Sequence, residues 1–273
     1  MGRCSTVLFF VLAGLYDPAG GAALDSVWIP ADAPGDSVLA IVITPTVDPP
    51  SSAASPVVFL LHGFAANPRT MLELIDLLAV ADRYGIGIVC PDGRSDSWYF
   101  DSPVDTSYRV ETAIIEQVIP WVDSCYGFRH DREGRGIVGI SMGGHGALYL
   151  ALRHPELFGA AASISGVLDL TETTQPAALA RRLGTFEEHA RRWRSLSVLA
   201  LVDSLVPDQL ALSIDCGLQD PFIAGNRRVH ERLLLRGIDH LYTERPGGHD
   251  RPTFGAALEH QLLFLSRFFD TPR

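Results

Sequence analysis

The sequence contains no lysine, because all 22 basic residues of the 273-residue chain are arginines. A Schiff-base lysine, a pyridoxal-phosphate lysine, a Walker-A lysine and a serine–lysine pair are therefore excluded, since each needs a lysine side chain. Any nucleophile in this chain must be activated by another base. Nine histidines are available for that task.

Basic runs and paired cysteines are also absent. The formal net charge of -10 argues against nucleic acid or an anionic membrane surface as a partner. The four cysteines are widely spaced, at Cys4, Cys90, Cys125 and Cys216. That spacing predicts neither a disulfide framework nor a cysteine zinc site. An incomplete H-E-x-x-H pattern starts at His230 but has Leu234 where the last histidine must stand, so we expect no metal or cofactor.

The N-terminal segment has the pattern of a secretory signal. Val7–Tyr16 is an apolar run of ten residues, too short to span a bilayer, and small residues follow it as far as Ala23. We expect residues 1–23 to be a signal peptide and residues 24–273 to form one domain. This predicts a secreted or periplasmic protein without stable membrane insertion. A cytoplasmic protein with a short N-terminal strand is the alternative.

Short apolar runs alternate with helical patterns along the rest of the chain. The runs predict strands at 38–44, 57–61, 86–90, 136–139, 160–164, 210–216 and 242–245. Helical spacing predicts helices at 70–84, 109–125, 146–154, 229–237 and 253–269. Runs that are apolar throughout are typical of parallel strands buried on both faces. The alternation predicts an α/β fold with a doubly wound, mostly parallel sheet. Residues 172–205 are too long for a simple crossover and predict a small helical insertion over the site.

The strongest motif is a G-x-S-x-G turn, Gly139-Ile140-Ser141-Met142-Gly143, between a predicted strand and a predicted helix. In this context such a serine is a nucleophile. Small residues two places to either side of Ser141 allow the strand and helix backbones to approach closely. The turn exposes the hydroxyl and directs the Met142 N–H toward a reacting carbonyl. An incidental serine in a glycine-rich turn is the alternative interpretation.

A serine nucleophile needs a general base, and the base needs an orienting acid. In α/β-hydrolases, which this turn resembles, the acid and then the histidine follow the serine along the chain. His249 lies in the loop after the last predicted strand and is the predicted base. Asp220 lies beyond the carboxyl end of the preceding strand, where ligands gather in open α/β sheets. It is preferred as the acid over Asp215, which lies within that strand.

Neighbouring residues receive supporting roles. The loop His62–Ala65 follows a predicted strand, so the N–H of Phe64 is the predicted second oxyanion donor beside that of Met142. The histidine that begins this loop is predicted to brace it. His145 is predicted to lie on the helix surface, because it follows the nucleophile on the same turn. Asp250 is predicted to tie down the loop of the base.

The ordered set of motifs resembles the esterase D family of α/β-hydrolases. That family includes S-formylglutathione hydrolases, feruloyl and acetylxylan esterases, and mycolyltransferases of the antigen 85 type. The motifs are Pro91–Gly93, Ser97–Tyr99, Gly139–Gly144, Gly146–Leu148, Arg153–Pro155, Phe158, Ser165–Gly166, Asp215–Gly217, Asp220, Asn226, His230 and Pro246–Asp250. The resemblance covers roughly residues 38 to 269. It implies the α/β-hydrolase fold, and its nucleophile, acid, base and oxyanion donors match Ser141, Asp220, His249, Phe64 and Met142.

The resemblance implies a serine carboxylic-ester hydrolase that works through an acyl-enzyme. We expect short-chain or carbohydrate-linked acyl esters as substrates, with Trp98 and Tyr99 lining the pocket; plain packing of these two residues is the alternative. The cysteine-bearing loop typical of S-formylglutathione hydrolases is replaced by Phe64–Asn67, which disfavours that substrate. Two alternatives remain: acyl transfer to a carbohydrate or lipid, as by a mycolyltransferase, and a non-catalytic carbohydrate-binding role on a hydrolase scaffold.

Overall fold

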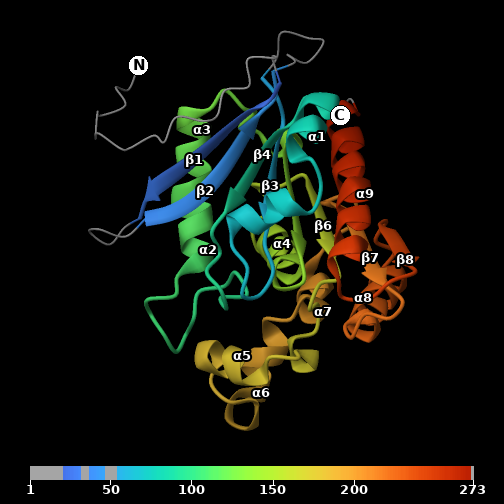
Figure 1. Ribbon diagram of the computed structural model, residues 1–273. Coiled ribbons are helices and arrows are strands. Elements are labelled where there is room, and N and C mark those ends of the chain that lie inside the picture. Colours follow the sequence, from blue (N-terminus) through green and yellow to red (C-terminus); the bar gives the residue numbers. More distant parts are fainter. Residues whose placement is uncertain (1–20, 32–36, 47–53, 272–273) are drawn as a thin grey trace.

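The computed structural model describes residues 21–31, 37–46 and 54–271. In these residues, eight strands form one sheet in the order β1-β2-β4-β3-β5-β6-β7-β8 (Figure 1). Strand β2 pairs antiparallel with β1 and β4, and all other neighbours pair parallel. The strands are β1 (Ala23–Pro30), β2 (Ser37–Thr44), β3 (Val57–Leu61), β4 (Gly87–Pro91), β5 (Arg135–Ile140), β6 (Ala160–Ile164), β7 (Ala211–Gly217) and β8 (Leu241–Arg245).

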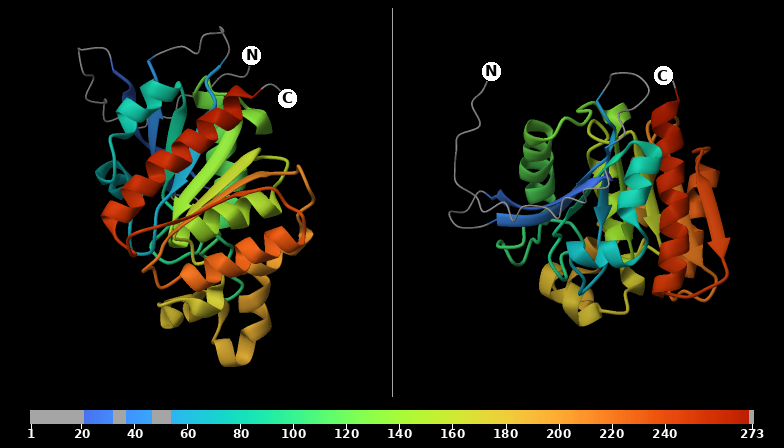
Figure 2. Two further views of the ribbon diagram at one scale, coloured as in Figure 1. Left: turned by 90° about the vertical axis from the view of Figure 1, so that its right-hand side faces the viewer. Right: turned by 45° about the horizontal axis from the view of Figure 1, so that its top comes forward.

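Helices cover both faces of the sheet, which confirms the doubly wound architecture. One face carries η1 (Pro68–Glu73), α1 (Leu77–Tyr84) and α9 (Arg251–Asp270), and Figure 2 shows α9 running across it. The other face carries α2 (Val110–Thr112), η2 (Ala113–Val118), α3 (Ile119–Cys125), α4 (Met142–Arg153) and α8 (Ile223–Leu235). Strand β3 shows why its sequence is apolar throughout. Phe59 packs toward α4, whereas Val58 and Leu60 pack toward α1 and α9.

The seven predicted strands are all present, and their ends differ from the prediction by no more than about one residue. Four predicted helices differ more in their bounds or type. The predicted 70–84 helix is two elements, η1 and α1, because Asp76 starts a new helix by accepting the Ala79 N–H at 3.0 Å. Helix α4 begins at Met142 rather than 146, because its glycines, poor helix formers, hide the first turn in the sequence. Helix α8 begins at Ile223 rather than 229. The 109–125 helix contains the π-helical segment η2 just before Pro120, which has no N–H to donate to the preceding turn.

The segment between β6 and β7 holds η4 (Leu170–Glu172), α5 (Pro176–Leu183), α6 (Phe186–Ser195), α7 (Val198–Leu201) and η5 (Val202–Ser204). Helices α5 and α6 project below the sheet, at the end where the parallel strands finish (Figure 1). Leu179, Leu183 and Trp193 are buried and join the core on the α4 side of the sheet. The insertion is therefore packed onto the domain rather than separate from it. The short η3 (Arg132–Gly134) precedes β5.

Two of the cysteines are buried and one is exposed in the described residues. Burial raises the pKa of the Cys90 thiol to about 12 and also raises that of Cys216, so neither forms a reactive thiolate near neutral pH. Within the described ranges, no helix has the length and apolar character needed to cross a membrane. The predicted signal peptide lies almost wholly in residues 1–20, outside the described residues, and its cleavage stays a prediction.

Candidate active site

Ser141 occupies the sharp turn between β5 and α4. Its backbone has φ 58° and ψ -115°, a conformation that a residue with a side chain rarely adopts. Hydrogen bonds hold it there, because the Ser141 N–H donates to Ile164 O at 2.9 Å and Val167 N–H donates to Ser141 O at 3.3 Å. Such strain persists only where the surroundings impose it, and it is a feature of reactive sites.

The glycines beside Ser141 are required by close backbone approach. A Cβ atom at Gly139 would lie 2.1 Å from Gly143 O, and one at Gly143 would lie 2.3 Å from Leu61 O. Both contacts are shorter than any real Cβ contact and involve backbone atoms that cannot move aside. The small residues predicted from the motif are therefore explained by the packing of α4 against β5 and the end of β3.

Ser141, His249 and Asp220 form a continuous hydrogen-bonded chain, although they come from three separate loops. His249 Nε2 lies 2.9 Å from Ser141 Oγ, and His249 Nδ1 lies 2.8 Å from Asp220 Oδ2. A carboxylate only accepts, so Nδ1–H donates to Asp220 and Nε2 is left to accept from the serine hydroxyl. Asp220 is buried, and its Oδ1 accepts the Phe222 N–H at 2.9 Å. The imidazole is thus oriented to receive the serine proton.

The loops of the acid and the base are tied together. Gln219 N–H donates to Gly247 O at 2.9 Å, and Gly247 N–H donates back to Gln219 Oε1 at 2.8 Å. Two rings also contact the base edge-to-face: Phe222 at 5.1 Å and Phe254 at 4.9 Å between ring centroids. These contacts fix the imidazole laterally. Gln219, Phe222 and Phe254 were not predicted, since no sequence motif marks them.

The structure distinguishes Asp220, the predicted acid, from the other two carboxylates considered, by their hydrogen-bond partners. Asp215, the alternative acid, is buried and binds Arg245 with both oxygens, so it stabilises the ends of β7 and β8. Asp250 is the N-cap of α9 and accepts the Thr253 N–H at 3.0 Å. Those hydrogen bonds to Thr253 lower the Asp250 pKa. Asp250 therefore fixes the loop of the base, as the sequence predicts.

The loop of the predicted oxyanion donor lies against Ser141. A Cβ atom at Gly63 would lie 3.5 Å from Ser141 Cβ, which brings the neighbouring Phe64 beside the serine. Met142 is the first residue of α4, so its N–H is at a helix N-terminus, where developing negative charge is favoured. His62 braces the loop: Gly93 N–H donates to its Nε2 at 3.0 Å, and its Nδ1 lies 2.9 Å from Gly63 O. Donation by Phe64 and Met142 stays a prediction.

Trp98 and Tyr99 are buried rather than open to a pocket, with 1% and 0% of their surfaces exposed. Tyr99 packs against Gly93 and Gly146, and its hydroxyl donates to His62 O at 3.0 Å. The Trp98 ring packs on Phe64 with 5.7 Å between centroids. Both residues support the loop His62–Ala65, which we call the oxyanion loop after its predicted role, and contact of Trp98 and Tyr99 with a substrate stays a prediction.

His145 is not on the helix surface, and this prediction was wrong. Its ring is fully buried, with Nδ1 3.0 Å from Trp98 O and Nε2 3.0 Å from Leu196 O. Burial lowers the His145 pKa to about 4. The error arose because the side of α4 that looks outward from the sheet is covered by the insertion. Both ring nitrogens face carbonyl oxygens, so His145 is not a second base.

The comparison with known families settles the class of this protein. The Esterase family model ("Putative esterase") matches residues 33–265. The chain belongs to the Esterase family. This confirms the predicted relationship to esterase D-like α/β-hydrolases, and the protein is a carboxylic ester hydrolase.

This esterase has named relatives. It is 26% identical to an acetyl esterase of Caldicellulosiruptor saccharolyticus over 224 residues, which cover 78% of this chain and 84% of that protein. It is 30% identical over 241 residues to the esterase Rv1288 of Mycobacterium tuberculosis (strain ATCC 25618 / H37Rv), covering 73% of this chain and 49% of that one, about half its length. A solved ferulic acid esterase has the same fold, with a TM-score of 0.76, 23% identity, and 91% of this chain and 99% of that chain covered.

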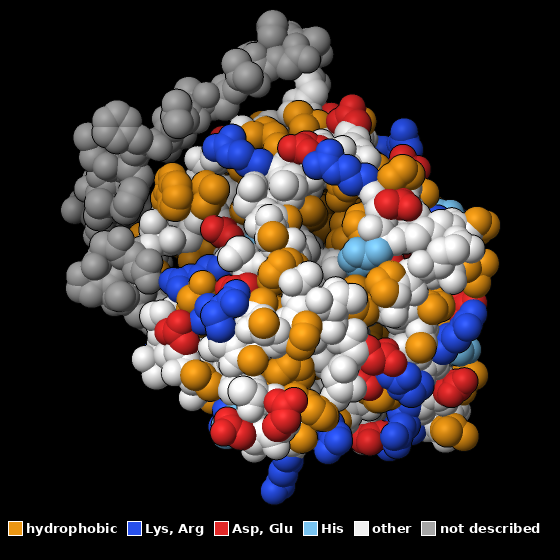
Figure 3. Space-filling view, turned by 60° about the horizontal axis from the view of Figure 1, so that its bottom comes forward, with side chains coloured by type: hydrophobic (Ala, Val, Ile, Leu, Met, Phe, Trp, Pro, Cys, Tyr) orange, Lys and Arg blue, Asp and Glu red, His pale blue; other side chains and the backbone are white. Residues whose placement is uncertain are grey.

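The esterase presents its site at the end of the sheet beside the insertion. The His249 side chain is 27% exposed, whereas Asp220 is buried behind it. Figure 3 looks onto this end, where histidine surface appears beside a hollow and apolar side chains, with acidic and arginine side chains around them. Among the described residues, no group of three or more histidine, cysteine, aspartate or glutamate side chains is arranged to hold a metal ion.

Proposed function

We propose that this esterase cleaves its substrates through an acyl-enzyme on Ser141. His249 removes the hydroxyl proton as Ser141 Oγ attacks the ester carbonyl, and Asp220 stabilises the imidazolium that forms. The tetrahedral intermediate collapses as His249 protonates the leaving alcohol. His249 then removes a proton from water as the water attacks the acyl-enzyme, and it returns that proton to Ser141 Oγ when the second tetrahedral intermediate releases the carboxylic acid. The observation that supports this most directly is the hydrogen-bonded chain of 2.9 and 2.8 Å from serine to histidine to aspartate.

The N–H groups of Phe64 and Met142 are proposed to bind the oxyanion. The first belongs to the loop that packs against Ser141, and the second begins the helix that Ser141 precedes. Preorganised donors of this kind typically contribute on the order of 10²- to 10³-fold each to the rate. No side-chain donor is needed in this proposal.

Short-chain or carbohydrate-linked acyl esters are the proposed substrates. The names of the acetyl esterase and the ferulic acid esterase relatives support a small acyl group on an alcohol. Nitrophenyl esters of increasing acyl length, methyl ferulate and acetylated xylan would rank these substrates.

Replacement of the nucleophile tests the mechanism. Ser141→Ala should lower the hydrolysis of p-nitrophenyl acetate by on the order of 10⁶-fold, as in comparable triads. Ser163→Ala is the matched control, since it removes a buried hydroxyl from the adjacent strand β6. Retained activity in Ser141→Ala would rule out the assignment. Addition of an alcohol to the same assay detects acyl transfer as a new ester, and a fluorophosphonate that leaves Ser141 unlabelled would instead support a non-catalytic role.

A further inference from the structure

The loop after β4 supports the oxyanion loop at several points. The contacts between the two loops are Gly93 N–H to His62 Nε2 at 3.0 Å, Ala65 N–H to Ser95 O at 2.8 Å, Tyr99 Oη–H to His62 O at 3.0 Å, and the Phe64 and Trp98 rings at 5.7 Å. They flank Phe64 on both sides along the chain. The position of the Phe64 N–H therefore depends on the conformation of residues 93–99, which we call the support loop.

The support loop is held in an unfavourable backbone conformation. Arg94, Trp98 and Tyr99 have φ values of 56°, 51° and 63°, and Ala65, which it contacts, has φ 55°. Left-handed conformations of non-glycine residues cost of order 1 kcal/mol each and persist only where neighbouring structure imposes them. The loop therefore needs an external restraint.

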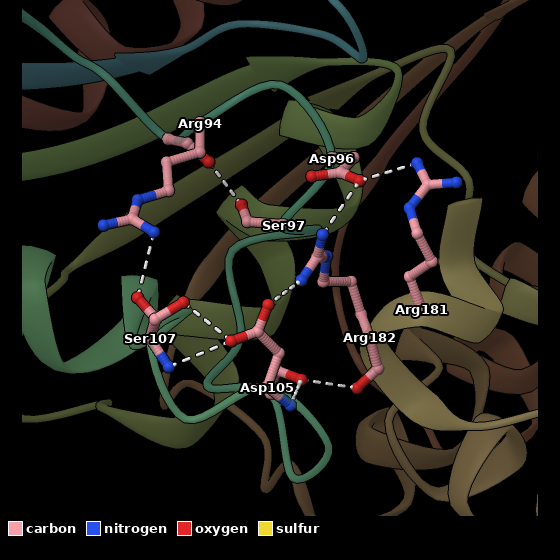
Figure 4. Close-up of polar contacts among 9 residues, drawn as sticks. Arg94, Asp96, Ser97, Asp105, Ser107, Arg181 and Arg182 are labelled. Carbon is pink, nitrogen blue, oxygen red and sulfur yellow. Dashed lines mark hydrogen bonds and ion pairs between the residues drawn. The ribbon is translucent and has the colours of Figure 1, made fainter.

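Helix α5 of the insertion supplies that restraint through Arg182. Its guanidinium lies 3.3 Å from Asp96 Oδ2 in the support loop and 2.7 Å from Asp105 Oδ2 (Figure 4). It also lies 3.5 Å above the centre of the Tyr108 ring. Ser102 Oγ–H donates to the Arg182 carbonyl at 2.7 Å, so side chain and backbone are both held. Arg182 and Asp96 are nearly fully buried, at 6% and 5% exposure.

The buried pair is not arranged for maximal stability. Asp96 Oδ1 and Arg182 Nε are buried without a hydrogen-bond partner in the described part of the chain. Removing charges from water is costly, and apolar side chains of similar volume often stabilise as well or better. An apolar pair does not fix the orientation of its two side chains, whereas a guanidinium fixes the orientation of a carboxylate. The arrangement is thus suited to setting the position of Asp96, the residue next to Ser95.

We propose that Arg182 is a positioning residue for the oxyanion hole. It fixes Asp96, which places Ser95 O to receive the Ala65 N–H, and this orients the adjacent Phe64 N–H toward the carbonyl attacked by Ser141. The proposal rests on the proposed roles of Phe64 and Ser141. It links the helical insertion to the rate of the chemical step rather than only to substrate access.

Two variants in neighbouring positions provide the test. Arg182→Lys keeps the charge but loses the planar fork, and should lower kcat/KM for p-nitrophenyl acetate about tenfold, the equivalent of about 1.4 kcal/mol. Arg181 binds the same oxygen, Asp96 Oδ2, at 3.0 Å, but its side chain is 58% exposed. Arg181→Met is the matched control and should stay within about twofold of the wild type, because exposed ion pairs contribute little.

The second measurement is inhibition by an aryl trifluoromethyl ketone, which adds to the serine and places an oxyanion in the hole. For a positioning residue of the hole, its inhibition constant rises by the same factor as kcat/KM falls. The pH profile stays unchanged, since His249 and Asp220 are untouched. Loss of inhibition in Ser141→Ala verifies the binding site and separately tests the proposed function.

Three results would overturn the proposal. They are wild-type kcat/KM in folded Arg182→Lys, a fall in kcat/KM without weaker inhibition, or an equal loss in Arg181→Met. If Arg182→Lys is unfolded at the assay temperature, Asp96→Asn decides by the same two measurements. It keeps the volume and an acceptor oxygen but loses the charge that Arg182 orients.

Discussion

Acidification should lower the free energy of unfolding of this protein, in particular through protonation of His145. The buried ring holds the pKa of His145 at about 4, below the value of 6.5 of the unfolded chain. Between these two values the unfolded state binds a proton that the folded state does not. Stability is therefore lost as the pH falls from about 6.5 toward 4, and it is regained as the pH rises.

The magnitude follows from the two pKa values. At pH 5 the unfolded histidine is almost fully protonated and the folded one almost fully neutral, which lowers the free energy of unfolding by about 2 kcal/mol relative to pH 7. Burial is the larger effect and favours the neutral ring, whereas the carbonyl oxygens of Trp98 and Leu196, 3.0 Å from its two nitrogens, favour the cation and offset part of it. Phe100 and Tyr149 pack around the ring at 6.4 and 5.5 Å between centroids, and neither offers a negative charge.

Urea unfolding at pH 7 and pH 5 measures this contribution. The control is His145→Asn, which keeps an amide donor for Trp98 O but does not titrate. The wild type should lose about 2 kcal/mol more than the variant on acidification. The reasoning is refuted if both lose the same amount. A wild type that gains stability at pH 5 would mean that an imidazolium donates to both Trp98 O and Leu196 O, which lie 3.0 Å from its nitrogens.

Three further substitutions test the site. Asp220→Asn should lower kcat by on the order of 10⁴-fold with an unchanged circular dichroism spectrum, because the amide favours the wrong histidine tautomer; a loss under tenfold would contradict the role of the acid. Gly143→Ala should cost about 3 kcal/mol in urea unfolding, since its Cβ would meet Leu61 O at 2.3 Å. Phe254→Leu should lower kcat several-fold, about 1 kcal/mol of orientation, with thermal stability nearly unchanged; an unchanged kcat would argue against lateral fixation of His249.

Much of the fold could be predicted because the sheet is buried on both faces. Strand β3 is Val-Val-Phe-Leu-Leu, and only a central strand covered by helices on each side uses such a run. The meeting of Ser141, Asp220 and His249 could be predicted because the loops after the parallel strands β5, β7 and β8 lie at the same edge of the sheet. Strand β1 was missed since Ala23–Pro30 begins where the signal pattern ends and pairs only with β2, as an edge strand.

Other features depend on contacts between segments far apart in the sequence. The burial of His145 results from Leu196, about fifty residues away, which reaches it from the insertion. The sequence predicts that Trp98 lines a pocket, but in the structure its backbone is left-handed and its side chain is buried in the core. Arg182 lies among several arginines of the insertion, and only the three-dimensional arrangement distinguishes it from the exposed Arg181. Local patterns carry no information about such pairings.

The tie between the loops after β7 and β8 has a consequence for inactivation. Strand β8 is the last in the sheet, and its pairing with β7 continues beyond the strand through Leu218 N–H to Arg245 O at 2.8 Å and the contacts of Gln219 with Gly247. Peeling of this one outer strand withdraws His249 from both Asp220 and Ser141 while the remaining strands stay joined. We therefore expect heat or denaturant to abolish activity through local unfolding of β8 at the edge of the sheet, before the core of the domain is exposed to water.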